Sequence, residues 1–255
     1  MNKINSVAFD LDGTIYLGNK LINGASEVIN YLTKKGYIIF YFTNNSSKNK
    51  LQLAEKLEKF GLSVTPDKVY CSLDATPIFL NIKNYKTVFC CGSQELTNAL
   101  RENSFFVFHE NNPEISYDAV VIGMNIKFSY EIIANASLVL QNNPQCKIIA
   151  CNLDASYPVE NGYRMPGCGP IVKAIEVASG RKVDYIVGKP DTFMINLIIQ
   201  EHRLSKDAIC IVGDSEESDI AMAEKANIKS FLLGGNTIKK NAASINSLLD
   251  LKDYL

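Results

Sequence analysis

The chain has 255 residues, of which 47% are hydrophobic, which is enough apolar material for one large core, or for one core and a smaller second domain. Lysine and arginine number 26 against 27 aspartates and glutamates, so the net charge of -1 gives no argument for a nucleic acid polymer or an anionic membrane as partner. No run of about 18 apolar residues is present, so the sequence predicts no membrane-spanning helix.

The cysteines and the N-terminus predict a cytoplasmic protein. Seven cysteines, an odd number without a C-x-x-C pair, are typical of reduced thiols. The apolar stretch near the N-terminus is about five residues long, too short for a secretion signal. The two histidines, His109 and His202, have no metal-ligand spacing around them, which argues against a zinc site or a histidine-dependent triad.

The first part of the chain alternates short β-rich runs with amphipathic segments. Residues 7–9 and 37–42 have the composition of strands, and residues 25–35 and 48–60 have the apolar spacing of helices. This strand–helix–strand–helix order predicts a parallel sheet with helices on both faces.

The pattern continues after about residue 76, but its style changes. Residues 151–170 are irregular and rich in proline and glycine, which marks a functional loop or a domain junction. The further predicted strands are 87–91, 105–108, 119–122, 147–151, 185–187, 208–212 and 229–233, and the further predicted helices are 94–102, 130–141, 171–178, 192–201 and 218–226.

The simplest interpretation is an α/β protein whose Rossmann-like, doubly wound parallel sheet is interrupted by an inserted domain. Residues 1–76 and 184–255 share the pattern of a strand followed by a polar loop, and residues 77–183 form a second α/β unit. In doubly wound sheets, ligands bind at the carboxyl ends of the strands. We therefore expect the chemistry in the residues that follow each outer strand.

Acids, a lysine and small polar residues follow four of the outer strands. They are Asp10, Asp12, Gly13 and Thr14 after the first strand, Thr43 and Asn44 after the second, Lys189 after residues 185–187, and Asp214 and Asp219 after residues 208–212. Each has a simpler explanation, because Asp-Gly is a common turn and an aspartate often caps a helix. Their shared position at strand ends of one predicted sheet favours a common crevice.

These four segments resemble the motifs of the haloacid-dehalogenase (HAD) superfamily of phosphatases and phosphotransferases. "FDLDGT" resembles the first motif, "FTNN" the second, "GKP" the third and "VGDSEESDI" the fourth. The run from "CNLDASYPVENGYRMPGCGP" to "VGKP" is similar to the NagD-like branch. The resemblance implies a HAD-like catalytic core with a C2-type cap between the second and third motifs.

The resemblance also implies a metal-assisted nucleophile. Asp10, Asp214 and the backbone carbonyl of Asp12 would hold Mg²⁺, and Asp10 would attack phosphorus to give an aspartyl-phosphate. Spacing alone does not choose between Asp10 and Asp12 as nucleophile. Asp12 would give a proton to the leaving oxygen and later take one from water.

The remaining motif residues would support this chemistry. Thr43, the Asn44 amide and Lys189 would hold the phosphate, and Gly13 would let backbone amides approach it. Lys189 would also neutralise the charge of the nucleophile and of the transition state. Thr14 would orient Asp12 or brace its loop. Asp219 would orient metal-bound waters or Lys189 from behind.

Two residues of the irregular loop are candidates for substrate specificity. By resemblance, Tyr157 falls where relatives place a side chain that touches the leaving group, and Arg164 would meet an anionic leaving group. The alternatives are that Tyr157 packs on the hinge and that Arg164 is a solvated surface residue.

The sequence therefore predicts a Mg²⁺-dependent phosphomonoester hydrolase for a small phosphorylated metabolite. A nucleoside monophosphate, a sugar phosphate and phosphoglycolate all remain open as substrates, and caps of this branch often form homodimers. A phosphotransferase on the same core and a non-catalytic metabolite-binding protein are the alternatives. The presence of both Asp10 and Asp12 argues against the last, and a dehalogenase would need neither Asp12 nor Asp214.

Overall fold

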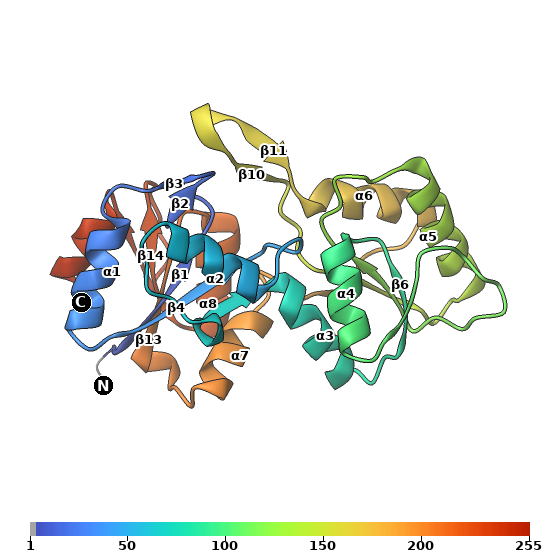
Figure 1. The fold of residues 1–255 in the computed structure, drawn as a ribbon, viewed down its shortest axis with the longest axis horizontal. Coiled ribbons are helices and arrows are strands. Elements are labelled where there is room, and N and C mark those ends of the chain that lie inside the picture. The colour runs from blue at the N-terminus through green and yellow to red at the C-terminus, as the bar shows by residue number, and fades with distance from the viewer. Residues whose placement is uncertain (1–3) are drawn as a thin grey trace.

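Two parallel sheets organise residues 4–255, the part of the chain that the computed structural model describes (Figure 1). The larger sheet has the strand order β15-β14-β13-β1-β4-β5, and every pair in it is parallel. Its strands are β1 (Ser6–Asp10), β4 (Ile38–Thr43), β5 (Val69–Cys71), β13 (Ile209–Gly213), β14 (Lys229–Leu233) and β15 (Ala242–Ile245).

The strand order of the larger sheet reverses at β1. The chain runs outward from β1 through β4 to β5, then returns to the other side of β1 as β13, β14 and β15. Every residue of β1 is buried, as expected for a central parallel strand that is covered on both faces. The neighbours β1 and β13 form the switch point at which doubly wound sheets bind their ligands.

Helices that bury one apolar side complete this lobe. Helix α1 buries Val28, Ile29 and Leu32, and α2 begins at an Asn49 cap that closes a reciprocal pair of hydrogen bonds with Gln52. The helices are α1 (Ala25–Lys34), α2 (Lys50–Lys59), α7 (Phe193–Glu201) and α8 (Ala221–Ala226), with short helical segments of other types at Pro66–Lys68, Lys206–Ala208, Glu216–Ile220 and Leu248–Asp253. A small hairpin, β2 (Tyr16–Leu17) and β3 (Lys20–Leu21), follows β1.

The second lobe is built on a smaller parallel sheet with the order β12-β9-β8-β6-β7. Its strands are β6 (Thr87–Cys90), β7 (Phe106–Phe108), β8 (Ala119–Ile122), β9 (Lys147–Ala150) and β12 (Tyr185–Ile186), and its helices are α4 (Gln94–Glu102), α5 (Tyr130–Asn142) and α6 (Cys168–Ser179). Helix α3 (Ser72–Ile82) leads into it. An antiparallel hairpin, β10 (Ser156–Pro158) and β11 (Arg164–Pro166), projects from this lobe beside the first (Figure 1).

The prediction of an α/β fold with a doubly wound parallel sheet and a second α/β unit is confirmed. The assignment of residues 185–187 to the outer sheet is wrong, because β12 pairs with β9 of the smaller sheet, Tyr185 opposite Ile149. A run this short has the same composition in either sheet, and the hydrogen bond from Val187 N–H to the Ala150 carbonyl extends the pairing. The domain limits at residues 76 and 184 stay a prediction.

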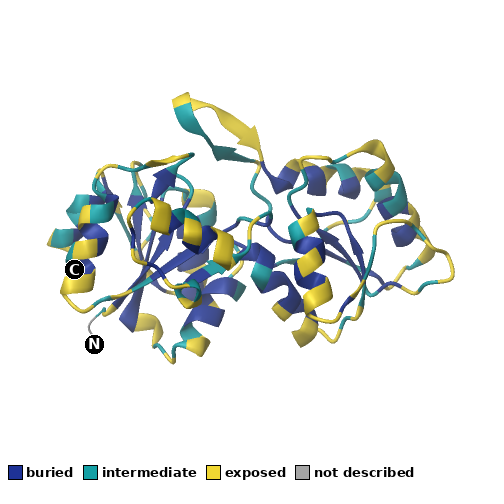
Figure 2. Ribbon diagram, viewed as in Figure 1, coloured by how far each residue is buried: buried dark blue, intermediate teal, exposed yellow. Residues whose placement is uncertain are grey.

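Burial follows the two sheets (Figure 2). One apolar cluster surrounds the larger sheet and continues through α3 and α4 to one face of the smaller sheet, and a second lies between the other face of the smaller sheet, α5 and α6. The seven cysteines are free and buried. Within residues 4–255, no helix combines the length and apolar composition that crossing a bilayer requires.

Candidate active site

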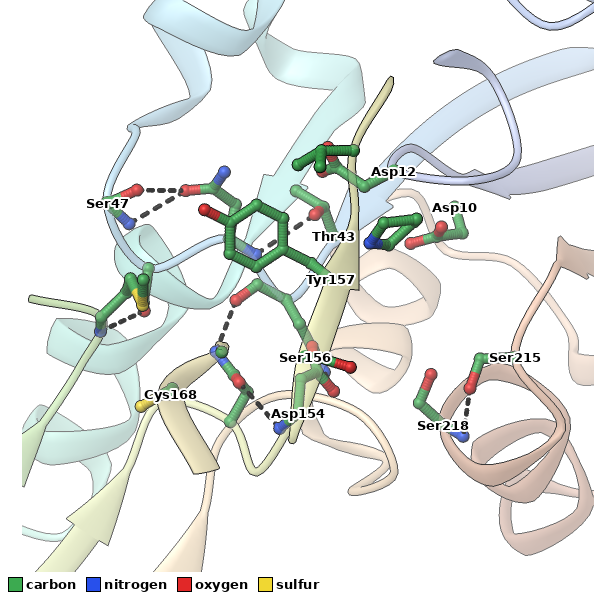
Figure 3. Close-up of a pocket in the computed structure, with 18 of the residues that line it drawn as sticks. Asp10, Asp12, Thr43, Ser47, Asp154, Ser156, Tyr157, Cys168, Ser215 and Ser218 are labelled. Atoms are coloured by element: carbon green, nitrogen blue, oxygen red, sulfur yellow. Dashed lines mark hydrogen bonds between the residues drawn. The ribbon is translucent and has the colours of Figure 1, made fainter. Parts of the chain in front are cut away.

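A cavity of about 360 Å³ lies at the carboxyl ends of the core strands and is also lined by the β10–β11 hairpin (Figure 3). The predicted site residues that line it are Asp10, Asp12, Thr43, Asn44, Tyr157, Arg164, Lys189, Asp214 and Asp219. The folding of the chain therefore brings residues from all four predicted motifs and from the irregular loop to one crevice.

Lys189 lies between two buried carboxylates. Its ammonium donates hydrogen bonds to Asp10 Oδ1 and to Asp219 Oδ1, the latter at 2.7 Å, and all three residues are at most 5% exposed. Burial lowers the pKa of Lys189, but the charges of Asp10 and Asp219 outweigh it and raise that pKa above its usual range. Lys189 is therefore a cation held against the predicted nucleophile.

Three acids, Asp10, Asp214 and Asp219, lie close together beside Lys189. One carboxylate oxygen from each of Asp10, Asp214 and Asp219 lies within 4.8 Å of the others. The pKa of Asp10 is raised by burial and then by the neighbouring acids, against the opposing effect of Lys189, and the pKa of Asp214 is raised by burial and by Asp219. A buried set of oxygen donors with surplus negative charge fits a Mg²⁺ ion, whose charge would relieve this repulsion.

Two residues of the first motif support Asp214. The Thr14 hydroxyl donates to Asp214 Oδ1 at 3.2 Å, so Thr14 orients Asp214 rather than Asp12. Gly13 has φ +99°, and a Cβ on it would lie 2.9 Å or less from the Asp214 carboxylate oxygens. Gly13 and Thr14 of the first motif therefore fit closely against Asp214, which follows β13.

Asp12 lies in a setting that the sequence did not reveal. The Tyr16 hydroxyl donates to Asp12 Oδ2 at 3.3 Å, and the Lys56 ammonium stands 3.5 Å from the centre of the Tyr16 ring. Burial raises the pKa of Asp12, although the charge of Lys56 opposes this effect. Asp12 therefore keeps its proton to a higher pH than a carboxylic acid in water does. No motif signals Tyr16 or Lys56, because each acts only through its position in the folded chain.

The Asn44 side chain is engaged by protein groups. Its Oδ1 accepts the Lys189 backbone N–H at 2.7 Å, and its Nδ2 donates to the Lys189 carbonyl at 3.0 Å and to Asp154 Oδ1 at 2.9 Å. Both hydrogens of the Asn44 side-chain amide are therefore used within the protein, and the contact of Asn44 with phosphate stays a prediction. Asp154, which follows β9 and was not predicted, anchors the smaller lobe to this amide.

Among the residues that the structure describes, the Thr43 hydroxyl donates to no protein group. Its oxygen accepts the Asn45 backbone N–H at 3.2 Å, which leaves the hydroxyl hydrogen to point elsewhere. It lines the cavity at the end of β4, whose Phe42 is paired with Asp10 of β1. This position suits its predicted contact with phosphate.

The β10–β11 hairpin places Tyr157 and Arg164 over the cavity. The Tyr157 ring lies in front of the residues at the strand ends (Figure 3). Arg164 is exposed, and its guanidinium donates to the Ser156 hydroxyl at 2.8 Å and carbonyl at 3.2 Å, across the hairpin. At the tip, Glu160 Oε1 accepts the backbone N–H of Asn19 at 2.8 Å, so the hairpin touches the core beyond the site.

A doubly wound sheet with carboxylates and a buried lysine at its switch point defines an α/β enzyme with an acidic site. Residues 7–105 match the family model described as haloacid dehalogenase-like hydrolase, and residues 186–247 match a second model described as HAD-hydrolase-like. The chain belongs to the haloacid dehalogenase-like hydrolase family.

Relatives and solved structures agree with this assignment. An acid sugar phosphatase of Staphylococcus epidermidis is 34% identical over 221 residues, covering 86% of this chain and 82% of the relative. Phosphoglycolate phosphatase 2 of Arabidopsis thaliana is 30% identical over 260 residues, covering 94% and 86%. The p-nitrophenyl phosphatase from Archaeoglobus fulgidus has a TM-score of 0.86 at 26% identity, and a structure assigned as a nagD protein has 0.88 at 28%, each covering 100% of both chains. These neighbours support the NagD-like assignment and a phosphomonoester hydrolase.

Proposed function

We propose that this chain is a Mg²⁺-dependent phosphomonoester hydrolase that acts on small phosphorylated metabolites through an aspartyl-phosphate on Asp10. The observation that carries the proposal is the buried arrangement of Lys189 against Asp10, beside Asp214, at the end of the cavity. The relatives whose names specify phosphoglycolate, acid sugar or nitrophenyl phosphate support a small substrate.

Asp10, Asp214 and the backbone carbonyl of Asp12 would hold Mg²⁺, with Asp219 close to the same oxygens. The ion supplies positive charge that lets the Asp10 carboxylate and the phosphate dianion approach each other. Lys189 adds a fixed cation on the Asp10 side, and Asp219 holds that ammonium in place. Lys189 and the ion would thus both neutralise negative charge at the site.

In the first step, an Asp10 oxygen forms a bond to phosphorus while the bond from phosphorus to the leaving oxygen breaks. Asp12, whose raised pKa favours its protonated form, gives its proton to the leaving oxygen. In the second step, ionised Asp12 takes a proton from water, the water oxygen bonds to phosphorus, and the bond from phosphorus to Asp10 breaks. Thr43 donates its hydroxyl hydrogen to a non-bridging oxygen throughout.

The smaller lobe excludes water and shapes the leaving-group end of the cavity. Tyr157 contributes its ring to that end, and the contact of Glu160 with Asn19 closes the hairpin onto the core. We extend the proposal to a cytoplasmic enzyme with the C2-type cap at about residues 77–183. A homodimer through this cap is the assembly we propose, by analogy with the branch.

A phosphate-release assay tests the function. Purified protein is incubated with 4-nitrophenyl phosphate, nucleoside monophosphates, sugar phosphates and phosphoglycolate, with added Mg²⁺ or with a chelator. We expect hydrolysis that stops with the chelator and returns with Mg²⁺. Hydrolysis that persists at full rate without a divalent ion would overturn the metal role, and transfer to added alcohols in place of water would indicate a phosphotransferase.

A further inference from the structure

Lys56 is a half-buried cation that the proposed chemistry does not use. It projects from α2 into the lining of the cavity, with its ammonium 3.5 Å from the Tyr16 ring centre and 5.9 Å from that of Phe60. Among the residues that the structure describes, no hydrogen bond or ion pair engages this ammonium. Its pKa is lowered by burial first of all, as expected for a charge removed from part of its water.

The position of Lys56 is on the leaving-group side of the cavity. The Tyr16 ring beneath it carries the hydroxyl that donates to Asp12, and Asp12 serves the leaving oxygen in the proposed mechanism. Lys189 and the acid cluster are at the phosphate end. A substituent on the leaving alcohol that extends past Asp12 therefore comes to the Lys56 ammonium.

The other cations near the cavity are less suited to this role. Arg164 and Lys48 also line the cavity, but both are exposed to solvent, and Arg164 already donates two N–H groups to Ser156. The charges of Asp12 and Glu160 favour the charged form of Lys56, and the charge of nearby Lys48 opposes it. One partly desolvated ammonium without a hydrogen-bond or ion-pair partner among the described residues, beside the exposed Lys48, suits a single carboxylate.

We propose that Lys56 is a specificity-determining residue that binds a carboxylate on the leaving alcohol, so that the enzyme prefers phosphomonoesters of hydroxy acids to those of neutral alcohols. The proposal rests on the proposed function, because the mechanism fixes which end of the cavity receives the leaving group. It places the charge selection on α2 of the core rather than on Arg164 of the hairpin.

Binding to a protein without turnover tests this residue separately from the hydrolase activity. Asp10→Asn protein with Mg²⁺ is titrated calorimetrically with two matched ester pairs. One pair is 2-phosphoglycolate and 2-hydroxyethyl phosphate, and the other is 3-phosphoglycerate and glycerol 3-phosphate. Each pair exchanges a carboxylate for a neutral hydroxymethyl group. The measured quantity is the ratio of the two dissociation constants within each pair, with Lys56 intact and replaced.

We expect the carboxylate ester to bind more tightly in at least one pair, and Lys56→Met to reduce that ratio about tenfold. Lys56→Arg should retain part of the preference, and Lys56→Gln replaces Lys56→Met if the latter fails to fold. Lys59→Met is the matched control, since it removes the same charge from an exposed position of α2 and should leave the ratio unchanged.

An unchanged ratio in both pairs on loss of the Lys56 charge would overturn the proposal, as would an equal drop in Lys59→Met. If the unmodified protein hydrolyses none of the four esters and no 4-nitrophenyl phosphate, the proposed function fails, and the binding ratios still decide the role of Lys56.

Discussion

The side chain of Asn44 holds the backbone of Lys189, a residue 145 positions further along the chain. Oδ1 accepts the Lys189 N–H at 2.7 Å and Nδ2 donates to the Lys189 carbonyl at 3.0 Å, so a single amide clamps both sides of this residue. The clamp aims the ammonium at Asp10 and Asp219. Asn44 of the second motif therefore positions Lys189 of the third motif.

Asn44→Asp should break this clamp, because a carboxylate cannot donate and would face the Lys189 carbonyl and the Asp154 carboxylate. We expect kcat to fall by about 10- to 100-fold, and the free energy of unfolding to fall by about 1–3 kcal/mol. Steady-state kinetics and urea unfolding measure the two effects. Asn30→Asp, at an exposed position of α1, is the control and should alter neither. Retention of full kcat by Asn44→Asp would show that the clamp does not position Lys189.

Gly13→Ala should weaken the metal site in addition to straining the backbone at this position. Both Gly13 and Gly36 have positive φ, +99° and +86°, so alanine at either position costs about 1–2 kcal/mol of stability. A Cβ at Gly13 meets the Asp214 carboxylate, whereas a Cβ at Gly36 meets nothing within 4 Å. We expect weaker Mg²⁺ activation, read from a Mg²⁺ titration of turnover, in Gly13→Ala only. Equal Mg²⁺ activation in the two variants would rule out this role for Gly13.

Gly18→Ala should loosen the contact between the hairpin and the core. A Cβ on Gly18 would lie 2.7 Å from Glu160 Cγ and Oε1, next to the bond from Asn19 N–H to Glu160. We expect kcat/KM to fall by about 3- to 10-fold, since a less firmly closed cap admits water and places the leaving group less well. Gly162→Ala, also at positive φ but in open space, is the control. A similar loss in the control would mean that backbone strain alone is responsible.

The interactions of Glu176 should make part of the free energy of unfolding depend on pH in the acid range. Hydrogen bonds from Lys173 at 2.7 Å and from the Val183 N–H at 3.0 Å lower the pKa of Glu176 to about 2 in the folded protein, against about 4.3 in an unfolded chain. The stabilisation is therefore complete above about pH 4.3 and is lost as the pH falls through about 2.

Glu176→Gln should lower the free energy of unfolding by about 1–3 kcal/mol at pH 7. The difference from the unmodified protein should shrink between about pH 4 and pH 2, because the native carboxyl is then protonated and equally uncharged. Thermal unfolding midpoints of both proteins across this pH range are the measurement. A difference that stays constant from pH 7 to pH 3 and below would contradict the pKa of Glu176.

Much of the fold is readable from local patterns, and the exceptions have physical causes. The apolar spacing of residues 25–35 predicts α1 to within one residue. Strands β5 and β15 were missed, because one has three residues and the other is largely alanine and serine. Helix α3 was missed as well, and it contains Pro77. The placement of β12 depends on pairing with β9, which no local pattern contains.

The residues of the site also fall into those that local patterns predict and those that depend on contacts between distant segments. The strand-end residues to which we assign the chemistry, such as Asp10 and Asp214, are found from spacing and family resemblance, because a turn after a strand fixes where they lie. Residues that act through contacts between distant segments are not. Asn44 reaches Lys189 and Asp154, and Lys56 reaches Tyr16, only after the sheet and α2 have packed. The sequence positions of these partners give no sign of the contacts.

The central claim is that Asp10 is the nucleophile, and turnover by Asp10→Asn tests it most directly. Release of phosphate from 4-nitrophenyl phosphate is measured with saturating Mg²⁺ for the unmodified protein and for Asp10→Asn, after circular dichroism has shown that both are folded. The account predicts a loss of kcat of at least about 1,000-fold, because an amide oxygen is a far poorer nucleophile than a carboxylate. Turnover by Asp10→Asn at the unmodified rate would contradict it.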